Sequence, residues 1–304
     1  MVFWEGLGQK GKEFVVRSYD AGLSQKPIRL YAGIDNEASL EKRVDLILQE
    51  FERTKAFERK AVMIFTPSGT GWVNPVAVEA AEEALDGDIA SVAMQYSNNA
   101  AVLQYLIDKD IPGEASSLLF SKLRARLDAL PKDKQPKLYV YGESLGSLGS
   151  QDIFAGKSAG EIAGRVDGAL WVGSPSASKL WSSLFGKAST QIVRFGTSAE
   201  DFESIPGQWG PSRVAFLYNA TDPVVWFTTR LAYQPPAWLK EPRAEGIDKH
   251  MQWRPVVTMG HIFFELFPGR RPPSGVGHTY DEKIPCAVAI VLQAENSKML
   301  GCDL

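Results

Sequence analysis

The chain has 304 residues, of which 44% are hydrophobic and 23% are charged, and its formal net charge is −3. These values are typical of a globular protein and exclude disorder as the main state. The negative charge argues against nucleic-acid binding, which needs a basic face. No apolar run approaches the roughly 18 residues of a transmembrane helix, so we expect no membrane span.

Short apolar segments alternate with amphipathic ones along the chain. Several apolar segments are nearly continuous runs, which is typical of strands buried on both faces. Strands alternating with helices indicate an α/β protein with a mostly parallel sheet flanked by helices on both faces. The predicted strands are Phe14–Tyr19, Ile28–Ile34, Ala61–Thr66, Ile89–Gln95, Lys137–Tyr141, Val166–Val172, Gln191–Phe195 and Val214–Tyr218. The predicted helices are Glu37–Phe57, Pro75–Ala84, Glu114–Leu130, Leu145–Phe154 and Ile284–Met299.

This alternation breaks between about Trp226 and Pro273, where proline and aromatic residues are frequent. We interpret the segment as a cap-like excursion that packs over the edge of the sheet. The whole chain, residues 1–304, is then a single domain.

One motif is typical of nucleophilic catalysis. Gly142-Glu143-Ser144-Leu145-Gly146 is a G-x-S-x-G sequence directly after the predicted strand Lys137–Tyr141. In a sharp strand-to-helix turn the two glycines allow close packing, and the serine hydroxyl projects at the carboxyl edge of the sheet. We therefore predict Ser144 as the nucleophile and the N–H of Leu145, at the start of the next helix, as an oxyanion donor.

Three histidines are candidates for the base. His278 lies in the glycine-rich segment Gly275–Tyr280, just before the last predicted helix, and a loop after the last strand can bring the base to the serine. His261 lies in an apolar stretch typical of a packed side chain, and His250 lies in a polar, surface-like stretch. His278 is the predicted base.

The acid is expected after a late strand and before the histidine. Asp222 follows the predicted strand Val214–Tyr218 and precedes a proline, so it is the first candidate, although a turn-forming aspartate has the same pattern. Asp201 and Asp281 are the alternatives.

A second oxyanion donor is expected in the loop after an early strand. The loop after Ala61–Thr66 contains Gly69 and Gly71, and we favour the N–H of Thr70, followed by that of Gly71. A plain surface turn is the alternative for this loop. The substrate pocket is predicted to include Gln95, Tyr96, Trp226 and Phe227.

No cofactor or metal is expected. Gly6-Leu-Gly8-Gln-Lys-Gly11 matches G-x-G-x-x-G, but no strand precedes it, so it is not a dinucleotide fingerprint. Cys286 and Cys302 form no CxxC motif, and we expect two independent thiols, with a disulfide as the alternative.

Several segments of the chain resemble the α/β-hydrolase superfamily. The chain resembles more narrowly the catalytic domain of a little-characterised actinobacterial group of α/β-hydrolases. The matching segments are Phe65–Pro75, Val92–Tyr96, Lys137–Gly146, Asp167–Gly173, Thr221–Trp226 and Gly277–Tyr280. The resemblance implies a serine hydrolase with Ser144, Asp222 and His278 as its triad. Members of this group often carry a membrane domain ahead of the catalytic one.

The predicted activity is hydrolysis of a small-molecule or lipid carboxylic ester through an acyl-enzyme. The alternatives are a thioesterase, amidase or acyltransferase with the same triad, or a non-catalytic binding module on this fold. By default we expect a soluble, cytoplasmic chain, or a membrane-tethered one if it belongs to the longer family architecture. The sequence does not indicate an oligomeric state.

Overall fold

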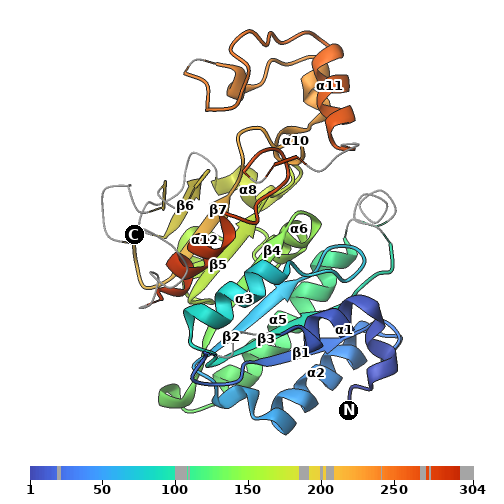
Figure 1. The fold of residues 1–304 in the computed structure, drawn as a ribbon, viewed down its shortest axis with the longest axis vertical. Helices are drawn as coiled ribbons and strands as arrows, with labels where there is room; N and C mark the ends of the chain where they lie inside the picture. Colours follow the sequence, from blue (N-terminus) through green and yellow to red (C-terminus); the bar gives the residue numbers. More distant parts are fainter. Residues whose placement is uncertain are drawn as a thin grey trace.

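The computed structural model describes residues 1–18, 22–99, 108, 110–184, 192–198, 201–202, 209–240, 242–267, 272–273 and 275–294. A sheet of seven parallel strands forms its centre, in the order β1-β3-β2-β4-β5-β7-β6 (Figure 1). The strands are β1 Ile28–Ala32, β2 Ala61–Thr66, β3 Ile89–Met94, β4 Lys137–Glu143, β5 Gly168–Val172, β6 Val193–Gly196 and β7 Arg213–Leu217. The predicted parallel α/β architecture is confirmed, although Gln191, expected in β6, lies outside the described residues.

The first predicted strand is wrong. Phe14 lies in helix α1, Gly8–Val16, and Tyr19 lies outside the described residues. The helix packs closely on β1, because a Cβ on Gly11 would lie 2.5 Å from the ring of Tyr31. The β-branched pair that follows Phe14 suggested a strand, but tertiary packing of Gly11 and Phe14 decides the conformation.

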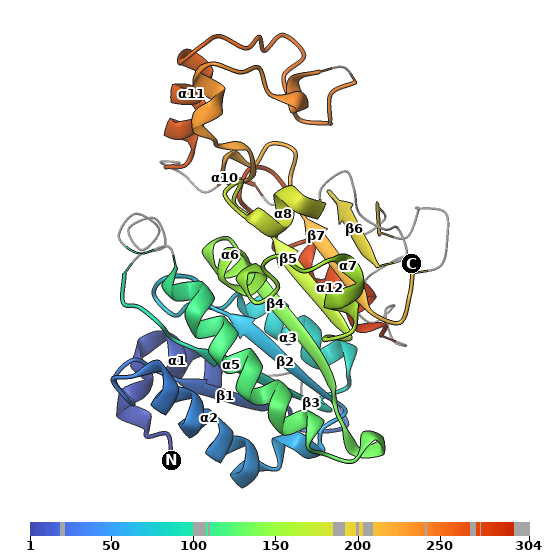
Figure 2. The same ribbon diagram turned by 180° about the vertical axis from the view of Figure 1, so that it is seen from behind.

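Helices cover both faces of the sheet, as predicted (Figures 1 and 2). One face carries α1, α3 and α12, and the other carries α2 and α5 to α8. Beyond α1, the helices are α2 Leu40–Thr54, α3 Pro75–Ala84, α5 Ile111–Asp128, α6 Leu145–Asp152, α7 Ala159–Ala163, α8 Lys179–Leu184, α10 Pro223–Trp226, α11 Val257–Glu265 and α12 Ile284–Leu292. Short 3₁₀ helices are η1 Trp4–Leu7, η2 Ala56–Glu58, η3 Lys132–Lys134, η4 Thr229–Ala232 and η5 Ala237–Leu239.

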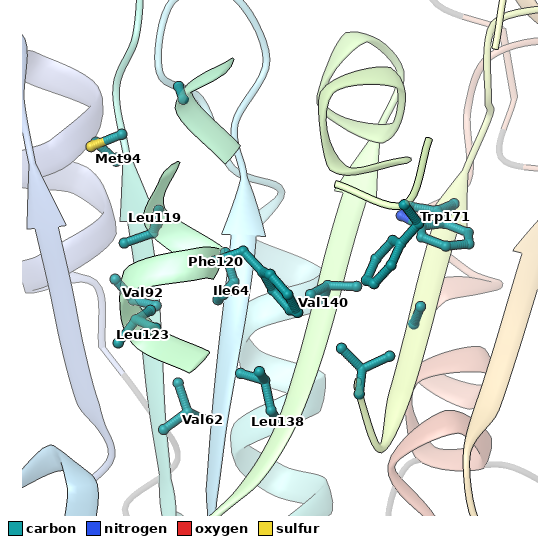
Figure 3. Packing of buried hydrophobic residues seen from close by; sticks show 14 of the residues in the cluster. Val62, Ile64, Val92, Met94, Leu119, Phe120, Leu123, Leu138, Val140 and Trp171 are labelled. Carbon is teal, nitrogen blue, oxygen red and sulfur yellow. The ribbon is translucent and has the colours of Figure 1, made fainter. Parts of the chain in front are cut away.

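Alternate residues of each buried strand enter opposite cores, because side chains of a strand alternate between its faces. In β2, Val62 and Ile64 pack toward α5, whereas Met63 and Phe65 pack toward α3 and α12. Figure 3 shows the first of these cores, with Phe120 of α5 between β2 and β4. The interior is therefore closed on both faces, which leaves the carboxyl ends of the strands as the place for a site.

The excursion leaves the body of the molecule beyond α10. Figures 1 and 2 show it, in orange, standing away from the sheet. The expectation that it packs over the edge of the sheet is therefore wrong. Its aromatic residues pack largely on one another: the ring centroid of Phe263 lies 5.7 Å from that of Phe227 and 5.5 Å from that of Phe267. These contacts lie within the excursion, whereas the ring of Trp226, at its start, packs 5.8 Å from that of Tyr218.

The cysteine expectation also fails. Cys286, in α12, is disulfide-bonded, so the prediction of two independent thiols is wrong. Cys302, the second cysteine of the sequence, and Met299, the predicted end of the last helix, lie outside the described residues. Within the described part of the chain, no helix is both long enough and apolar enough to cross a bilayer.

Candidate active site

Ser144 occupies a strained turn between β4 and α6. Its φ of 56° and ψ of −123° are unusual for a residue with a side chain, and its N–H donates to the carbonyl of Val172 at 2.9 Å. The two flanking positions have room only for glycine. A Cβ on Gly142 would lie 2.4 Å from the carbonyl oxygen of Gly146, and one on Gly146 would lie 2.2 Å from that of Thr66. This geometry is that of the predicted elbow.

A buried polar network holds α6 in place behind Ser144. Gln151 donates to the hydroxyls of Ser147 and Ser174 at 2.7 and 2.9 Å, and its carbonyl oxygen accepts from Ser178 at 2.5 Å. The four side chains are no more than 1% exposed. Since buried polar groups are costly unless they are paired, the network fixes α6 against the loop after β5.

Asp222 and His278 are in direct contact. Nδ1 of His278 lies 2.7 Å from Oδ2 of Asp222, which is completely buried. The carboxylate has two further donors: the N–H of Val224 bonds to Oδ1 at 2.8 Å, and the phenol of Tyr280 bonds to Oδ2 at 2.5 Å. Asp222 also caps the short helix α10. The acid and base predicted from the sequence are thus brought together, 56 residues apart in the chain.

The loops that carry this pair are tied to each other. The side-chain amide of Asn219, just after β7, donates to the carbonyls of Gly277 and Thr279 at 2.8 and 3.1 Å. The hydroxyl of Thr221 accepts the N–H of Gly277 at 2.9 Å. Asn219 therefore fixes the backbone on both sides of His278.

His278 lies beside the elbow. A Cβ on Gly173, the residue after Val172, would lie 2.7 Å from Cε1 of His278, so only a glycine leaves room for the ring. Val172 in turn accepts the N–H of Ser144. Among the hydrogen bonds of the described residues, none joins Ser144 to His278. In unliganded sites such catalytic bonds are often long and tighten only with substrate.

Two carboxylates act on the charge of His278. Burial opposes protonation, but Asp222 and Glu143 together outweigh it and raise the pKa of His278 above its usual value. The pKa of Glu143, the residue before Ser144, is raised as well, in this case by burial. Asn74, His278 and Tyr141 partly offset this effect. The imidazole is thus placed in surroundings that favour its charged form.

The loop after β2 distinguishes between the two predicted oxyanion donors. The N–H of Gly71 already donates to the carbonyl of Ser68 at 2.8 Å, so in this conformation it is not available to an oxyanion. In the described part of the chain, the N–H of Thr70 has no acceptor. Leu145 is the first residue of α6, where the N–H has no acceptor within the helix.

Gln95 and Tyr96 support this loop. The amide of Gln95 donates to the carbonyl of Thr70 at 3.3 Å, and the phenol of Tyr96 donates to that of Pro67 at 2.9 Å. Both side chains are buried, at 6% and 2% exposure, and neither lines the cavity at His278 or the smaller cavity next to it. We predicted that they border the pocket, but in the structure they support the loop after β2.

A cavity of about 1150 Å³ lies between His278 and the excursion. Trp226 and Trp238 line it and also line a second cavity of about 580 Å³. Phe227 lines neither of these two cavities and packs on Phe263 instead. The apolar wall on the excursion side is formed by Met251, Ile262, Phe264, Leu266 and Phe267.

The remaining sequence candidates lie elsewhere. His250 is exposed, as expected, but His261 is not packed: its side chain is 60% exposed and pairs with Glu265 at 2.9 Å. Asp201 binds the backbone of Thr197 and Ser198, and Asp281 accepts from Asn74 at 3.2 Å. No group of three or more His, Cys, Asp or Glu side chains in the described ranges is arranged to hold a metal ion.

Sequence reasoning missed several residues of the site: Gly173, Asn219 and Tyr280. Two of them had a visible signal, because Gly173 follows the strand next to the nucleophile and Tyr280 follows the base by two residues. The partnership of Tyr280 with Asp222 depends on tertiary structure and has no local pattern.

Three solved structures are similar to this chain at low sequence identity. A cutinase-like protein from Cryptococcus sp. is similar in structure, at 16% identity and a TM-score of 0.35 over 55% of this chain and 78% of that one. A Trichoderma reesei cutinase in complex with a C11Y4 phosphonate inhibitor has 12% identity and a TM-score of 0.34 over 62% of this chain and 76% of that one. An acetyl xylan esterase has 13% identity and a TM-score of 0.33 over 55% of this chain and 85% of that one. A search of curated proteins finds no match.

The sequence itself matches a family profile over residues 28–300, which include both loops of the candidate site and the elbow. The chain belongs to the Alpha/beta-hydrolase family.

Proposed function

We propose that the chain is a serine hydrolase that cleaves carboxylic esters, with Ser144, Asp222 and His278 as its triad. The observation that carries the proposal is the bonded pair of Asp222 and His278, seated on Gly173 beside the strained turn of Ser144. Because Nδ1 of His278 is bonded to Asp222, Nε2 is the nitrogen left to face the serine.

In this mechanism Oγ of Ser144 attacks the ester carbonyl while Nε2 of His278 takes its proton. The N–H groups of Leu145 and Thr70 stabilise the oxyanion, and Gly71 is no longer included. The bond to the alcohol then breaks as His278 returns the proton to the leaving oxygen, and an acyl-enzyme remains. Water, activated by the same imidazole, releases the acid and restores the hydroxyl.

The larger cavity favours an ester with an apolar acyl group. It opens at His278, and its far wall includes Phe264 and Phe267 of the excursion. Its volume of about 1150 Å³ exceeds the usual range for a drug-sized ligand, so a medium or long chain fits. A lipid or small-molecule ester is therefore the proposed substrate class.

The test is hydrolysis of p-nitrophenyl acetate, butyrate and octanoate by the wild type, by Ser144→Ala and by Ser182→Ala. Ser182 is an exposed serine of α8 that lines the smaller cavity, so its variant is the matched control. We expect Ser144→Ala to lose at least 1000-fold in kcat, and the control to keep wild-type rates.

Labelling with a fluorophosphonate separates the remaining outcomes. If Ser144 is labelled without turnover of these esters, the triad functions and the ester class is wrong. In that case thioesters, amides and acyl transfer to an added alcohol are assayed next. If a folded sample shows neither labelling nor turnover, the enzyme proposal fails and a binding module becomes the better interpretation.

A further inference from the structure

Glu143 is a titratable residue at the site that the mechanism above does not use. Its carboxylate accepts from the side-chain amide of Asn74 at 2.9 Å and from the phenol of Tyr141 at 3.0 Å. Asn74 and Tyr141 are 2% and 1% exposed, so the carboxylate is bound by buried partners. Both partners are neutral donors, and no ion pair within the described part of the chain involves Glu143.

The register of the sheet places Glu143 next to His278. Glu143 pairs with Val172 across β4 and β5, and the next residue, Gly173, lies against the imidazole. Alternation along β4 puts Glu143 on the same face as Tyr141, which is the face that carries α12 and Tyr280. His278 therefore has two carboxylates near it. Asp222 is hydrogen-bonded to its Nδ1, and Glu143 is the residue before Ser144.

Each of these carboxylates has its own buried tyrosine. Tyr280 donates to Asp222, and Tyr141 donates to Glu143. The carboxylate of Glu143 is partly buried and has only neutral donors, so it is costlier to keep charged than a carboxylate in water. A positive charge that forms nearby during the reaction offsets part of that cost.

We propose that Glu143 is a positioning residue for His278: its carboxylate stabilises the imidazolium that forms when Ser144 gives up its proton. The inference rests on the proposed function. The base acts from the neutral form of His278, and a neutral ring gains little from the charge of Glu143. In the transition state the ring carries a proton and is attracted by both carboxylates, so the interaction with Glu143 is stronger there, which is the condition for a gain in rate.

Other ionisable groups lie on the elements around His278. Asp281 shares the amide of Asn74 with Glu143, at 3.2 Å, and Lys283 of α12 donates to Asn219 at 2.7 Å. Tyr280 lies edge-on to the imidazole. From the excursion, the same cavity is lined by Asp248, His261 and Glu265. These groups remain unchanged in the variants below, so a difference between variants reports on Glu143.

The test compares Glu143→Gln with Tyr141→Phe. Glu143→Gln removes the charge and keeps the length of the side chain, whereas Tyr141→Phe removes a hydrogen bond to the same carboxylate and keeps the charge. Because the chain has three histidines, the imidazole resonances of His278 can be assigned in an NMR titration. The second measurement is the pH profile of kcat/KM for p-nitrophenyl butyrate.

In Glu143→Gln we expect the pKa of His278 to fall by roughly half a unit to one unit, which is about three- to tenfold in proton affinity. The acid limb of kcat/KM should move to lower pH by the same amount, with a similar fold loss of kcat on the plateau. Tyr141→Phe should show neither the fall in pKa nor the shift of the acid limb.

An unchanged pKa of His278 in Glu143→Gln overturns the inference, and so does an equal fall in Tyr141→Phe, which would indicate a structural effect. The titration does not depend on turnover. A wild type that hydrolyses no ester, but whose His278 shifts as expected in Glu143→Gln, counts against the proposed function and supports the coupling.

Discussion

Gly173 offers a way to displace the imidazole without removing any group of the proposed triad. In Gly173→Ala the new methyl would lie 2.7 Å from Cε1 and 3.1 Å from Nδ1 of His278, and 2.9 Å from the ring of Tyr280. Ordinary contacts begin near 3.4 Å, so the imidazole has to move by about 0.7 Å. Gly173 also has a φ of +55°, which costs an alanine roughly 1–2 kcal/mol.

Misplacement of a reacting group by about 1 Å costs on the order of 100-fold in rate. We therefore expect kcat/KM for p-nitrophenyl butyrate to fall by tenfold to 100-fold in Gly173→Ala. The strained backbone should lower the melting temperature by a few degrees. The assay combines steady-state kinetics, thermal unfolding, and circular dichroism at the assay temperature, so that loss of folded protein is separated from loss of rate.

Gly160→Ala is the matched control. Gly160 lies in α7, and no heavy atom is within 4 Å of the position its Cβ would take. Alanine in a helix is favoured over glycine by about 1 kcal/mol, so activity should be unchanged and stability equal or higher. A folded Gly173→Ala enzyme with wild-type kcat/KM would refute the placement of His278 on Gly173.

Two further predictions concern the partners of the triad and the wall of the cavity. Tyr280→Phe removes one of the donors to Asp222, so the carboxylate attracts the proton of His278 more strongly and the pKa of His278 rises. Because the base must be neutral to accept a proton, the acid limb of kcat/KM should move to higher pH by about half a unit; a move to lower pH would contradict the assignment. Trp226→Ala opens the wall between the two cavities, where its ring centroid lies 6.3 Å from that of Trp238, so the octanoate-to-butyrate ratio of kcat/KM should rise. An unchanged ratio would mean that the acyl chain does not reach Trp226.

The central sheet and the elbow could be predicted because their signals are local. Short apolar segments predicted all seven strands, several of them as nearly continuous apolar runs, and the motif around Ser144 combined a strand, two glycines and a helix start within ten residues. The predicted start of α3 at Pro75 is also confirmed, and the side chain of Asn74 caps the helix there. These features depend on residues that are close in the sequence.

Other features depend on contacts that the sequence does not display. The segment around Phe14 forms a helix because Gly11 allows a close approach to Tyr31, a partner in another element. The hydrogen bond from the N–H of Gly71 to the carbonyl of Ser68 follows from the conformation of one turn. The hydrogen bonds of Gln95 likewise depend on where three separate loops meet, so a strand end predicted to border a pocket instead supports a loop.

The excursion enters and leaves the fold through the loops that carry Asp222 and His278. Asp222 precedes the excursion and His278 follows it, while Asn219 and Thr221 join the two ends by hydrogen bonds. The cost of closing a loop grows only slowly with its length, and here the closure is made at the root of the loop. Under the proposed function, the excursion is consequently an exchangeable part. Its length and lining can change, and with them the choice of substrate, while the hydrogen bonds at its base keep Asp222 and His278 together.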